Sequence, residues 1–260
     1  MPFATVDGKQ VYYVQQGAQG LPVVFVHGSG ASHLIWWPHV RALADLARPV
    51  ALDLPGHGKS EGPGRVTVDA YCDVLLDFLD ALAFDRALIV GHSLGGAIAQ
   101  TFAVTHPDRT AALGLVGTGA RLRVLPAILE GIVSPSDFDE TVRLIVENTY
   151  AADNLDAATR RRAEEDLRAC PPQVARGDFA ACNGFDIMPR LGEIHAPTLI
   201  VCGSEDKMTP VKYSEFLASK IPNSRLVVVE RAGHSVMIEQ AAELGQALAG
   251  FVRELRESRE

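Results

Sequence analysis

The segment that most constrains this fold is residues 89–96, which read Ile-Val-Gly-His-Ser-Leu-Gly-Gly. Apolar residues lead into the pattern Gly-x-Ser-x-Gly, and the small and apolar residues that follow predict a strand turning sharply into a helix. Gly91 and Gly95 lack side chains where the two backbones come closest, so Ser93 can stand exposed at a strained turn. The pattern therefore predicts a nucleophilic Ser93, provided that its chemical partners occur elsewhere in the chain.

Short apolar segments alternate with helical patterns along most of the chain. The expected strands, mostly continuous apolar runs, are residues 11–14, 22–26, 50–54, 87–90, 112–116, 197–202 and 226–229. Continuous apolar strands are typical of a sheet covered on both faces. Apolar residues at helical spacing predict helices over residues 71–82 and 244–255. The alternation indicates an α/β protein with a mostly parallel sheet.

The stretch from Ala120 to Ala196 interrupts this alternation. It shows no convincing strand, and its helical patterns lie around residues 126–132, 137–149 and 157–169. A structureless loop of this length is uncommon in a compact domain. We therefore expect residues 120–196 to form a helical insertion in a core built from residues 1–119 and 197–260.

Charge and hydropathy narrow the classes of partner. The formal net charge of −8 offers no basic surface for nucleic acid, and the acidic residues 164–166 follow the only dense basic run, Arg160–Arg162. That run predicts a solvated helix face. No segment approaches the about 18 consecutive apolar residues of a membrane span, and residues 1–7 do not resemble a secretion signal. We expect a cytoplasmic protein with neither nucleic-acid nor membrane partners.

The cysteines are scattered along the chain. Cys72, Cys170, Cys182 and Cys202 have none of the spacings typical of a metal site, so we expect no bound metal. Free, buried thiols are the preferred interpretation, as a reduced compartment allows. A bridge between Cys170 and Cys182 is the alternative.

A nucleophilic serine needs a histidine to take its proton and a carboxylate to orient that histidine. In a strand-turn-helix site these partners follow the serine in the order Asp or Glu, then His. His234 follows the last expected strand, next to Gly233, and Asp206 follows the preceding strand in Gly-Ser-Glu-Asp. We predict Asp206 as the carboxylate in preference to Glu205. His92 should point away from Ser93 across the turn.

Three other histidines have a structural interpretation. We interpret His57, His106 and His195 as turn or helix-end residues.

Backbone N–H groups are expected to bind the oxyanion that forms during acyl transfer. In sites of this architecture one donor is the residue after the nucleophile, here Leu94, and the second lies in the loop after an earlier strand, here Ser29. The sequence Gly28-Ser29-Gly30 has glycines on both sides of Ser29, which would let its N–H turn inward.

Four blocks of sequence together resemble the α/β-hydrolase superfamily, in its serine carboxylesterase-like branch. The blocks are residues 27–30, 53–60, 91–96 and the pair 203–206 with 233–234. The resemblance implies a mostly parallel sheet of about eight strands, a helical cap between the sixth and seventh strands, and no cofactor. It also implies that residues 53–60 form a structural turn. The fold alone does not determine the substrate.

Single residues separate branches of that superfamily. Ser93 stands where similar dehalogenases and epoxide hydrolases have aspartate and dienelactone hydrolases have cysteine. Residues 27–31 read His-Gly-Ser-Gly-Ala where proline iminopeptidases have His-Gly-Gly-Pro-Gly, and Ser235 stands where carbon–carbon bond hydrolases usually have tryptophan. The expected activity is therefore hydrolysis of small to medium acyl or aryl esters through an acyl-enzyme, with a small-molecule ester as the partner.

Several alternatives remain open at this point. The same groups could cleave a lactone, amide, thioester or carbon–carbon bond, or act in perhydrolysis, and a low-turnover receptor is the more distant alternative. The expected pocket residues are Trp36 and Trp37, after the oxyanion loop, with Leu125 and Leu129 of the insertion. Both pairs could instead serve packing. For the oligomeric state, a homodimer is an open alternative.

Overall fold

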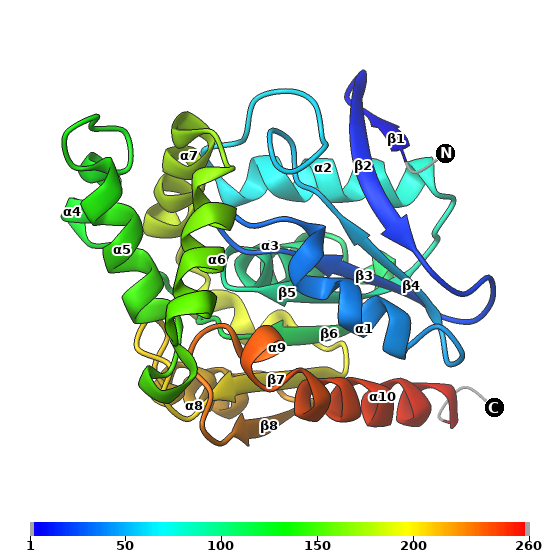
Figure 1. Cartoon of the computed structure of the whole chain (residues 1–260). Helices are drawn as coiled ribbons and strands as arrows, with labels where there is room; N and C mark the ends of the chain where they lie inside the picture. The colour runs from blue at the N-terminus through cyan, green and yellow to red at the C-terminus, as the bar shows by residue number, and fades with distance from the viewer. Residues whose placement is uncertain (1–2, 258–260) are drawn as a thin grey trace.

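A twisted eight-stranded sheet organises the protein, whose computed structural model describes residues 3–257 (Figure 1). Its strands, named in chain order, are β1 (Phe3–Val6), β2 (Lys9–Gln15), β3 (Pro22–Val26), β4 (Arg48–Leu52), β5 (Ala87–His92), β6 (Thr110–Val116), β7 (Thr198–Gly203) and β8 (Ser224–Val229). They lie in the order β1-β2-β4-β3-β5-β6-β7-β8. Only the pairings of β1 with β2 and of β2 with β4 are antiparallel.

The mostly parallel α/β sheet predicted from the sequence is confirmed. All seven expected strands are present with shifts of a few residues at their ends, and β1 is the strand that the sequence did not reveal. β1 has only four residues, with buried and exposed side chains alternating, so it carries no continuous apolar run. The central strands β5, β6 and β7 are buried along their whole length, which explains why they were the clearest in the sequence.

Helices cover both faces of the sheet. On one face α2 (Val68–Ala81), α3 (Leu94–Thr105) and α8 (Val211–Lys220) contribute to one apolar core. On the other face α1 (Trp37–Ala42), α9 (Val236–Glu239) and α10 (Ala241–Glu257) pack over a second core. No helix within residues 3–257 has both the length and the apolar character needed to cross a membrane.

Four α-helices lie between β6 and β7 and gather at one end of the sheet (Figure 1). They are α4 (Pro126–Gly131), α5 (Phe138–Thr149), α6 (Ala157–Arg168) and α7 (Pro172–Gly184). They share a small apolar cluster of their own, which includes Ile132, Val142 and Phe179. The three expected helices correspond to α4, α5 and α6, whereas α7 was not predicted. The division of the chain at residues 120 and 196 stays a prediction.

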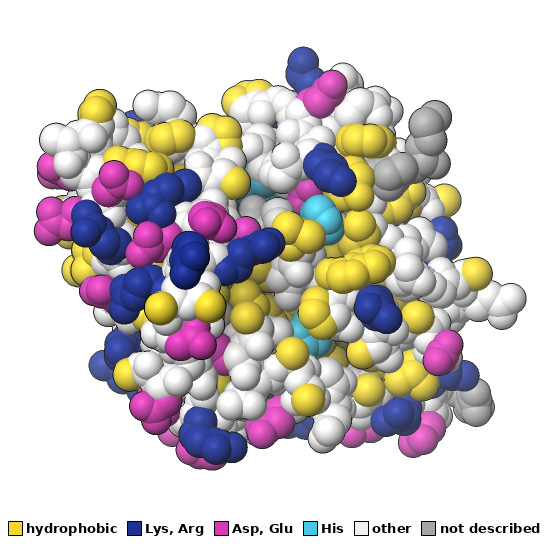
Figure 2. Space-filling model, viewed as in Figure 1, with side chains coloured by type: hydrophobic (Ala, Val, Ile, Leu, Met, Phe, Trp, Pro, Cys, Tyr) yellow, Lys and Arg dark blue, Asp and Glu magenta, His cyan; other side chains and the backbone are white. Residues whose placement is uncertain are grey.

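The surface of these helices carries interspersed positive and negative side chains (Figure 2). On α6, Arg160 forms an ion pair with Glu147 at 2.9 Å, and Arg162 pairs with Asp166 one turn along, also at 2.9 Å. The expected solvated face at Arg160–Arg162 is therefore present. Each of the four cysteines is free and buried, so the alternative of a Cys170–Cys182 bridge is wrong.

The turn between β5 and α3 depends on very close backbone approaches. A Cβ atom on Gly91 would lie 2.0 Å from the Gly95 carbonyl oxygen, and one on Gly95 would lie 2.3 Å from the carbonyl oxygen of Val26 at the end of β3. Ser93, between them, has φ +51° and ψ −112°, a conformation that costs energy for a residue with a side chain. The chain thus brings β3, β5 and α3 together around Ser93.

A methyl group at Gly95 should disrupt this arrangement. We expect Gly95→Ala to lower the free energy of unfolding by about 1–3 kcal/mol, because the added Cβ meets backbone atoms that cannot rotate away. Urea denaturation followed by circular dichroism measures the difference. The control is Gly250→Ala in α10, where an added Cβ meets nothing within 4 Å and should stabilise the helix by about 0.5–1 kcal/mol. Equal stability of Gly95→Ala and the unaltered protein would contradict the prediction.

Candidate active site

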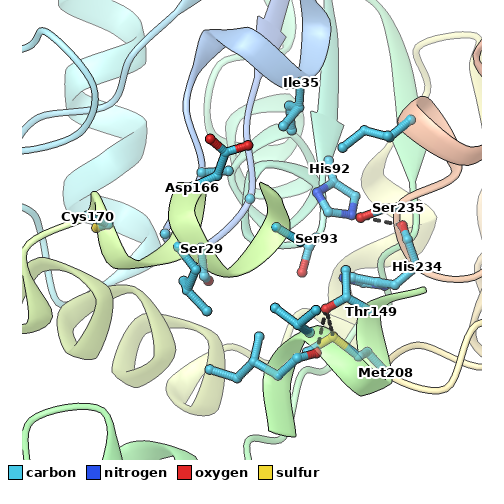
Figure 3. Close-up of a pocket in the computed structure, with 18 of the residues that line it drawn as sticks. Ser29, Ile35, His92, Ser93, Thr149, Asp166, Cys170, Met208, His234 and Ser235 are labelled. Carbon is cyan, nitrogen blue, oxygen red and sulfur yellow. Dashed lines mark hydrogen bonds between the residues drawn. The ribbon is translucent and has the colours of Figure 1, made fainter. Parts of the chain in front are cut away.

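A cavity of about 320 Å³ lies where the carboxyl ends of β3 and β5 face the inserted helices (Figure 3). Its lining includes the loop after β3 and the turn after β5, together with residues of α5, α6 and α7. The larger apolar lining side chains include Leu34, Ile35, Leu122, Val124, Ile145, Val146, Leu167, Phe179, Met208, Met237 and Ile238. Ser93 and His234 both lie in the same wall. A mostly apolar cavity with a few converging polar groups is typical of a small-molecule site.

Ser93 presents its hydroxyl to this cavity rather than to the helix that it begins (Figure 3). Its side chain makes no capping hydrogen bond to α3, although Ser93 occupies the N-cap position. Its backbone is held instead: the Ser93 N–H donates to the Val116 carbonyl at 3.1 Å, and the Thr118 hydroxyl donates to the Ser93 carbonyl at 2.9 Å. The Ser93 hydroxyl thus faces the cavity without capping α3, while two hydrogen bonds hold the main chain of Ser93.

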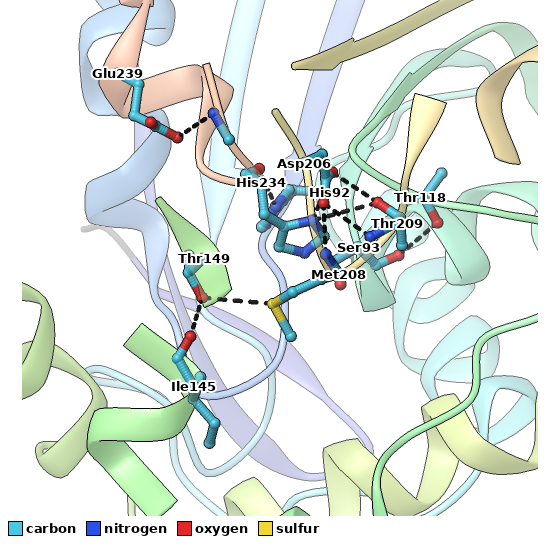
Figure 4. Close-up of polar contacts among 11 residues, drawn as sticks. His92, Ser93, Thr118, Ile145, Thr149, Asp206, Met208, Thr209, His234 and Glu239 are labelled. Carbon is cyan, nitrogen blue, oxygen red and sulfur yellow. Dashed lines mark hydrogen bonds and ion pairs between the residues drawn. The ribbon is translucent and has the colours of Figure 1, made fainter. Parts of the chain in front are cut away.

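Asp206 and His234 form a buried hydrogen-bonded pair beside Ser93 (Figure 4). The His234 Nδ1–H donates to Asp206 Oδ2 at 2.9 Å. Asp206 also accepts the N–H groups of Met208 and Thr209 at 2.9 and 2.8 Å and the Thr209 hydroxyl at 2.8 Å. Burial opposes ionisation of Asp206, but His234 and the Thr209 donors outweigh it and lower the pKa of Asp206 below its ordinary value.

The structure thus brings together Ser93, Asp206 and His234, which are far apart in the sequence. With Nδ1 protonated, the neutral His234 ring leaves Nε2 as its proton acceptor. Within residues 3–257 no hydrogen bond joins His234 to the Ser93 hydroxyl, and such contacts often shorten only when substrate binds. Glu205 is exposed, and among the described residues the carboxylate that His234 bonds to is that of Asp206.

A carboxylate that the sequence did not reveal holds the His234 loop. Glu239, at the end of α9, accepts the Gly233 N–H through Oε1 at 2.9 Å and the Ala151 N–H through Oε2 at 2.8 Å (Figure 4). Ser235 N–H also donates to the Thr149 carbonyl at 3.0 Å. The loop that carries His234 is therefore fastened to the end of α5. No motif marks Glu239, because its role depends on a segment nearly 90 residues away.

His92 does not point away from Ser93, so that expectation is wrong. Its ring lies in the cavity wall and contacts the His234 ring, with the two centroids 4.6 Å apart. The His92 Nε2–H donates to the His234 carbonyl at 3.1 Å. Burial and the neighbouring His234 lower the pKa of His92 well below its ordinary value, so this ring stays neutral. The missing side chain of Gly28, whose Cβ would lie 2.7 Å from His92 Nδ1, makes room for the ring.

The loop after β3 lies beside the Ser93 turn, with Ser29 in the cavity wall. Among the described residues, neither the Ser29 N–H nor the Leu94 N–H has an acceptor. Both expected donors are thus available for a ligand oxygen. His27 holds the loop through two hydrogen bonds. Its Nδ1–H donates to the Gly28 carbonyl at 2.8 Å, and its Nε2 accepts the Leu54 N–H at 3.0 Å. Burial is the main cause that lowers the pKa of His27 to about 4.

A second buried cluster connects this loop to α7. Asp178 accepts hydrogen bonds from the Gly30 N–H at 2.9 Å, from His57 Nε2 at 2.8 Å and from the Tyr71 hydroxyl at 2.5 Å. His57 does lie in a turn, as expected, but it also forms this ion pair. Burial opposes protonation of His57, but Asp178 outweighs it and raises the pKa of His57 well above its ordinary value. No motif or spacing in the sequence indicated Asp178.

The four residues predicted to line the pocket do not line this cavity, which corrects the expectation from the sequence. Within the described chain the cavity lining includes none of Trp36, Trp37, Leu125 and Leu129. Trp36 is fully buried in the core, with its ring 5.0 Å from that of Phe25, and Trp37 packs against the same core. Leu125 is 59% exposed, and Leu129 packs within the inserted helices. Leu34 and Ile35, just before the tryptophans, line the cavity instead.

Within residues 3–257, no three His, Cys, Asp or Glu side chains are grouped so that they could hold a metal ion. The cavity lining includes the hydroxyl of Ser93 and the imidazole of His234, which is hydrogen-bonded to the Asp206 carboxylate. A hydroxyl next to a histidine that a carboxylate orients is the arrangement used in nucleophilic acyl transfer.

Known proteins of similar sequence and structure include several hydrolases. The chain is 31% identical to the dihydrolipoyllysine-residue acetyltransferase component of the acetoin cleaving system of Pseudomonas putida, over 96% of this chain and 68% of that protein. It is 28% identical to 3-oxoadipate enol-lactonase 1 of Acinetobacter baylyi, over 96% of both. A thermophilic esterase from Thermogutta terrifontis superposes with a TM-score of 0.88 at 25% identity, covering 97% of this chain and 98% of that one.

A family model for the alpha/beta hydrolase fold matches residues 22–241, which span the sheet from β3 to β8 and include Ser93, Asp206 and His234. The order of these residues along the chain and the turn after β5 fit that family. By this match, the chain belongs to the alpha/beta hydrolase family.

Proposed function

We propose that this protein is a serine hydrolase that cleaves small to medium carboxylic esters through an acyl-enzyme intermediate. The observation that carries the proposal is the buried Asp206–His234 hydrogen bond of 2.9 Å in the same cavity as the Ser93 hydroxyl. Neutral His234 is oriented to accept a proton, and ionised Asp206 stabilises the imidazolium that results. No cofactor is needed for this chemistry.

The first half-reaction transfers the acyl group to the enzyme. Ser93 attacks the ester carbonyl while His234 takes the hydroxyl proton, and the N–H groups of Ser29 and Leu94 bind the negative oxygen of the tetrahedral intermediate. His234 then returns the proton to the leaving alcohol as the carbon–oxygen bond breaks. In the second half-reaction water attacks the acyl-enzyme in the same way, and the acid and Ser93 are released.

The size and lining of the cavity support the proposed substrate class. A volume of about 320 Å³ lies near the lower end of the usual range for small-molecule sites. Most of its wall is aliphatic or aromatic, and the inserted helices contribute Ile145, Val146, Leu167 and Phe179. In this proposal residues 120–196 act as a cap that closes the acyl pocket and excludes water.

Lactone hydrolysis is a second candidate, because a relative with 28% identity over nearly the whole of both chains is named an enol-lactonase. A lactone is a cyclic ester, so the same groups would act on it. A panel of p-nitrophenyl esters with acyl chains of increasing length, together with five- and six-membered lactones, separates the candidates by their kcat/KM values.

Ser93→Ala should abolish ester hydrolysis, because nothing replaces the nucleophile. We expect kcat for p-nitrophenyl butyrate to fall by about 10⁶-fold if the three residues act as a unit. Ser136→Ala, on an exposed loop between α4 and α5, is the control and should keep full activity. A fluorophosphonate should label the unaltered protein and not Ser93→Ala. Labelling without turnover would favour a receptor, and near-native turnover by Ser93→Ala would refute the mechanism.

Asp206→Asn should lower kcat by about 10⁴-fold, because an amide cannot stabilise the imidazolium and favours the wrong tautomer of His234. Glu205→Gln is the matched control, since it removes the neighbouring, exposed carboxylate. Steady-state kinetics on the same ester compare the two variants. A larger loss in Glu205→Gln than in Asp206→Asn would show that the carboxylate has been misassigned.

The value of kcat/KM should fall in a single step as the solution becomes acidic. A histidine base works only when neutral, so kcat/KM should fall as the pH is lowered through the range in which histidine side chains usually become protonated. Asp206 should add no second step there, because, despite burial, its pKa is lowered by His234 and the Thr209 donors and the carboxylate stays ionised where histidines become protonated. Turnover of an uncharged ester between pH 4 and 9 measures the profile. A rate that stays constant down to pH 4 is incompatible with a histidine base.

A further inference from the structure

One face of the inserted helix α7 contacts the loop that carries the Ser29 N–H. Asp178 and Cys182 are four residues apart on α7, so their side chains project from the same side of the helix. Asp178 Oδ2 accepts the Gly30 N–H at 2.9 Å, and Cys182 Sγ lies 3.5 Å from the Ser29 hydroxyl. The loop after β3 therefore takes its shape partly from a segment far away in the sequence.

The position of Asp178 is fixed by further donors. His57 Nε2 lies 2.8 Å from Asp178 Oδ2, and His57 Nδ1 lies 3.1 Å from the Pro55 carbonyl. Because a carboxylate and a carbonyl can only accept, both ring nitrogens of His57 carry protons and the ring is an imidazolium. The side chains of His57 and Asp178 are both completely buried. Tyr71 donates to the other carboxylate oxygen at 2.5 Å, so Asp178 has little freedom to move.

Packing alone does not explain this arrangement. A buried ion pair loses much of its electrostatic gain to desolvation, and apolar side chains of similar volume often stabilise a fold equally well. An apolar residue at position 178, however, could not accept the Gly30 N–H. The distinctive contribution of the pair is a rigid, negatively charged acceptor for one backbone N–H group.

That N–H group belongs to the peptide that follows Ser29. Gly30 itself has φ +67°, a backbone conformation that favours glycine, and an added Cβ would lie 2.6 Å from the Leu167 side chain of α6. Asp178 fixes the Ser29–Gly30 peptide plane. The preceding Gly28–Ser29 peptide, which carries the Ser29 N–H, is held through its carbonyl by the His27 Nδ1–H at 2.8 Å and the Ala31 N–H at 3.2 Å. Together these hydrogen bonds restrict rotation of the Ser29 N–H away from the cavity. Asp178 itself is not part of the cavity lining within the described chain and does not touch a substrate there.

We propose that Asp178 is a positioning residue, which sets the oxyanion loop through the Gly30 N–H so that α7 takes part in acyl transfer. This inference rests on the proposed function. The loop matters most when charge develops on the substrate oxygen, so its displacement should affect the transition state more than substrate binding. A misplacement of about 1 Å by a residue outside the reacting groups can cost about 10²-fold in rate.

The test compares variants of the full-length protein in steady-state hydrolysis of p-nitrophenyl butyrate. Asp178→Ala should lower kcat by about 10- to 10²-fold and leave KM within about threefold. Asp178→Asn keeps an oxygen acceptor for Gly30 and should recover most of kcat. Val174→Ala, which loosens the packing of the same helix without reaching the loop, should keep kcat. If Asp178→Ala does not fold, Asp178→Ser replaces it, because its shorter side chain withdraws the acceptor from Gly30.

Binding of butylboronic acid gives a readout that separates positioning from stability. This compound forms a tetrahedral adduct with an active serine, so its affinity should fall in parallel with kcat in Asp178→Ala and not in Val174→Ala. Unchanged kcat in a folded Asp178→Ala would overturn the inference, as would equal losses in Asp178→Ala and Val174→Ala. Absence of ester or lactone turnover by the unaltered protein would instead refute the proposed function.

Discussion

The close approach of three backbone segments at Gly91 and Gly95 is the constraint on which the site depends. Only hydrogen atoms fit where α3 begins against β5 and against the end of β3, since added Cβ atoms would lie 2.0–2.3 Å from carbonyl oxygens. This contact places the Ser93 turn and the Ser29 loop side by side. The strain at Ser93 is sustained because β5, which leads into the turn, is fully buried and hydrogen-bonded to β3 on one side and to β6 on the other.

Carboxylates then fix the loops that surround this turn. Asp206 orients His234, Glu239 fastens the His234 loop to the end of α5, and Asp178 connects the Ser29 loop to α7. Two of these three carboxylates join the core to the inserted helices. The helices between β6 and β7 are thus held to both sides of the cavity by charge-assisted hydrogen bonds, which are stronger than neutral ones.

Local sequence rules predicted the parts of the site that depend on neighbours in the chain. The strand-turn-helix at Ser93 and the positions of Asp206 and His234 after strands could be predicted, because backbone geometry and strand order determine them. The pocket wall could not be predicted. Trp36 belongs to the core and Leu34 to the cavity although they are two residues apart, and only the packing of η1 (His33–Trp36) against the sheet determines which side chain points inward.

The sequence by itself determined an α/β hydrolase fold with a strained serine, because glycine spacing and continuous apolar strands are local signals of steric fit and burial. The tertiary structure alone decided which distant groups meet. Asp178 reaches Gly30 across 148 residues, His57 becomes charged by facing Asp178, and His92 turns into the cavity against His234. Burial makes each of these contacts strong, and burial exists only once the chain has folded.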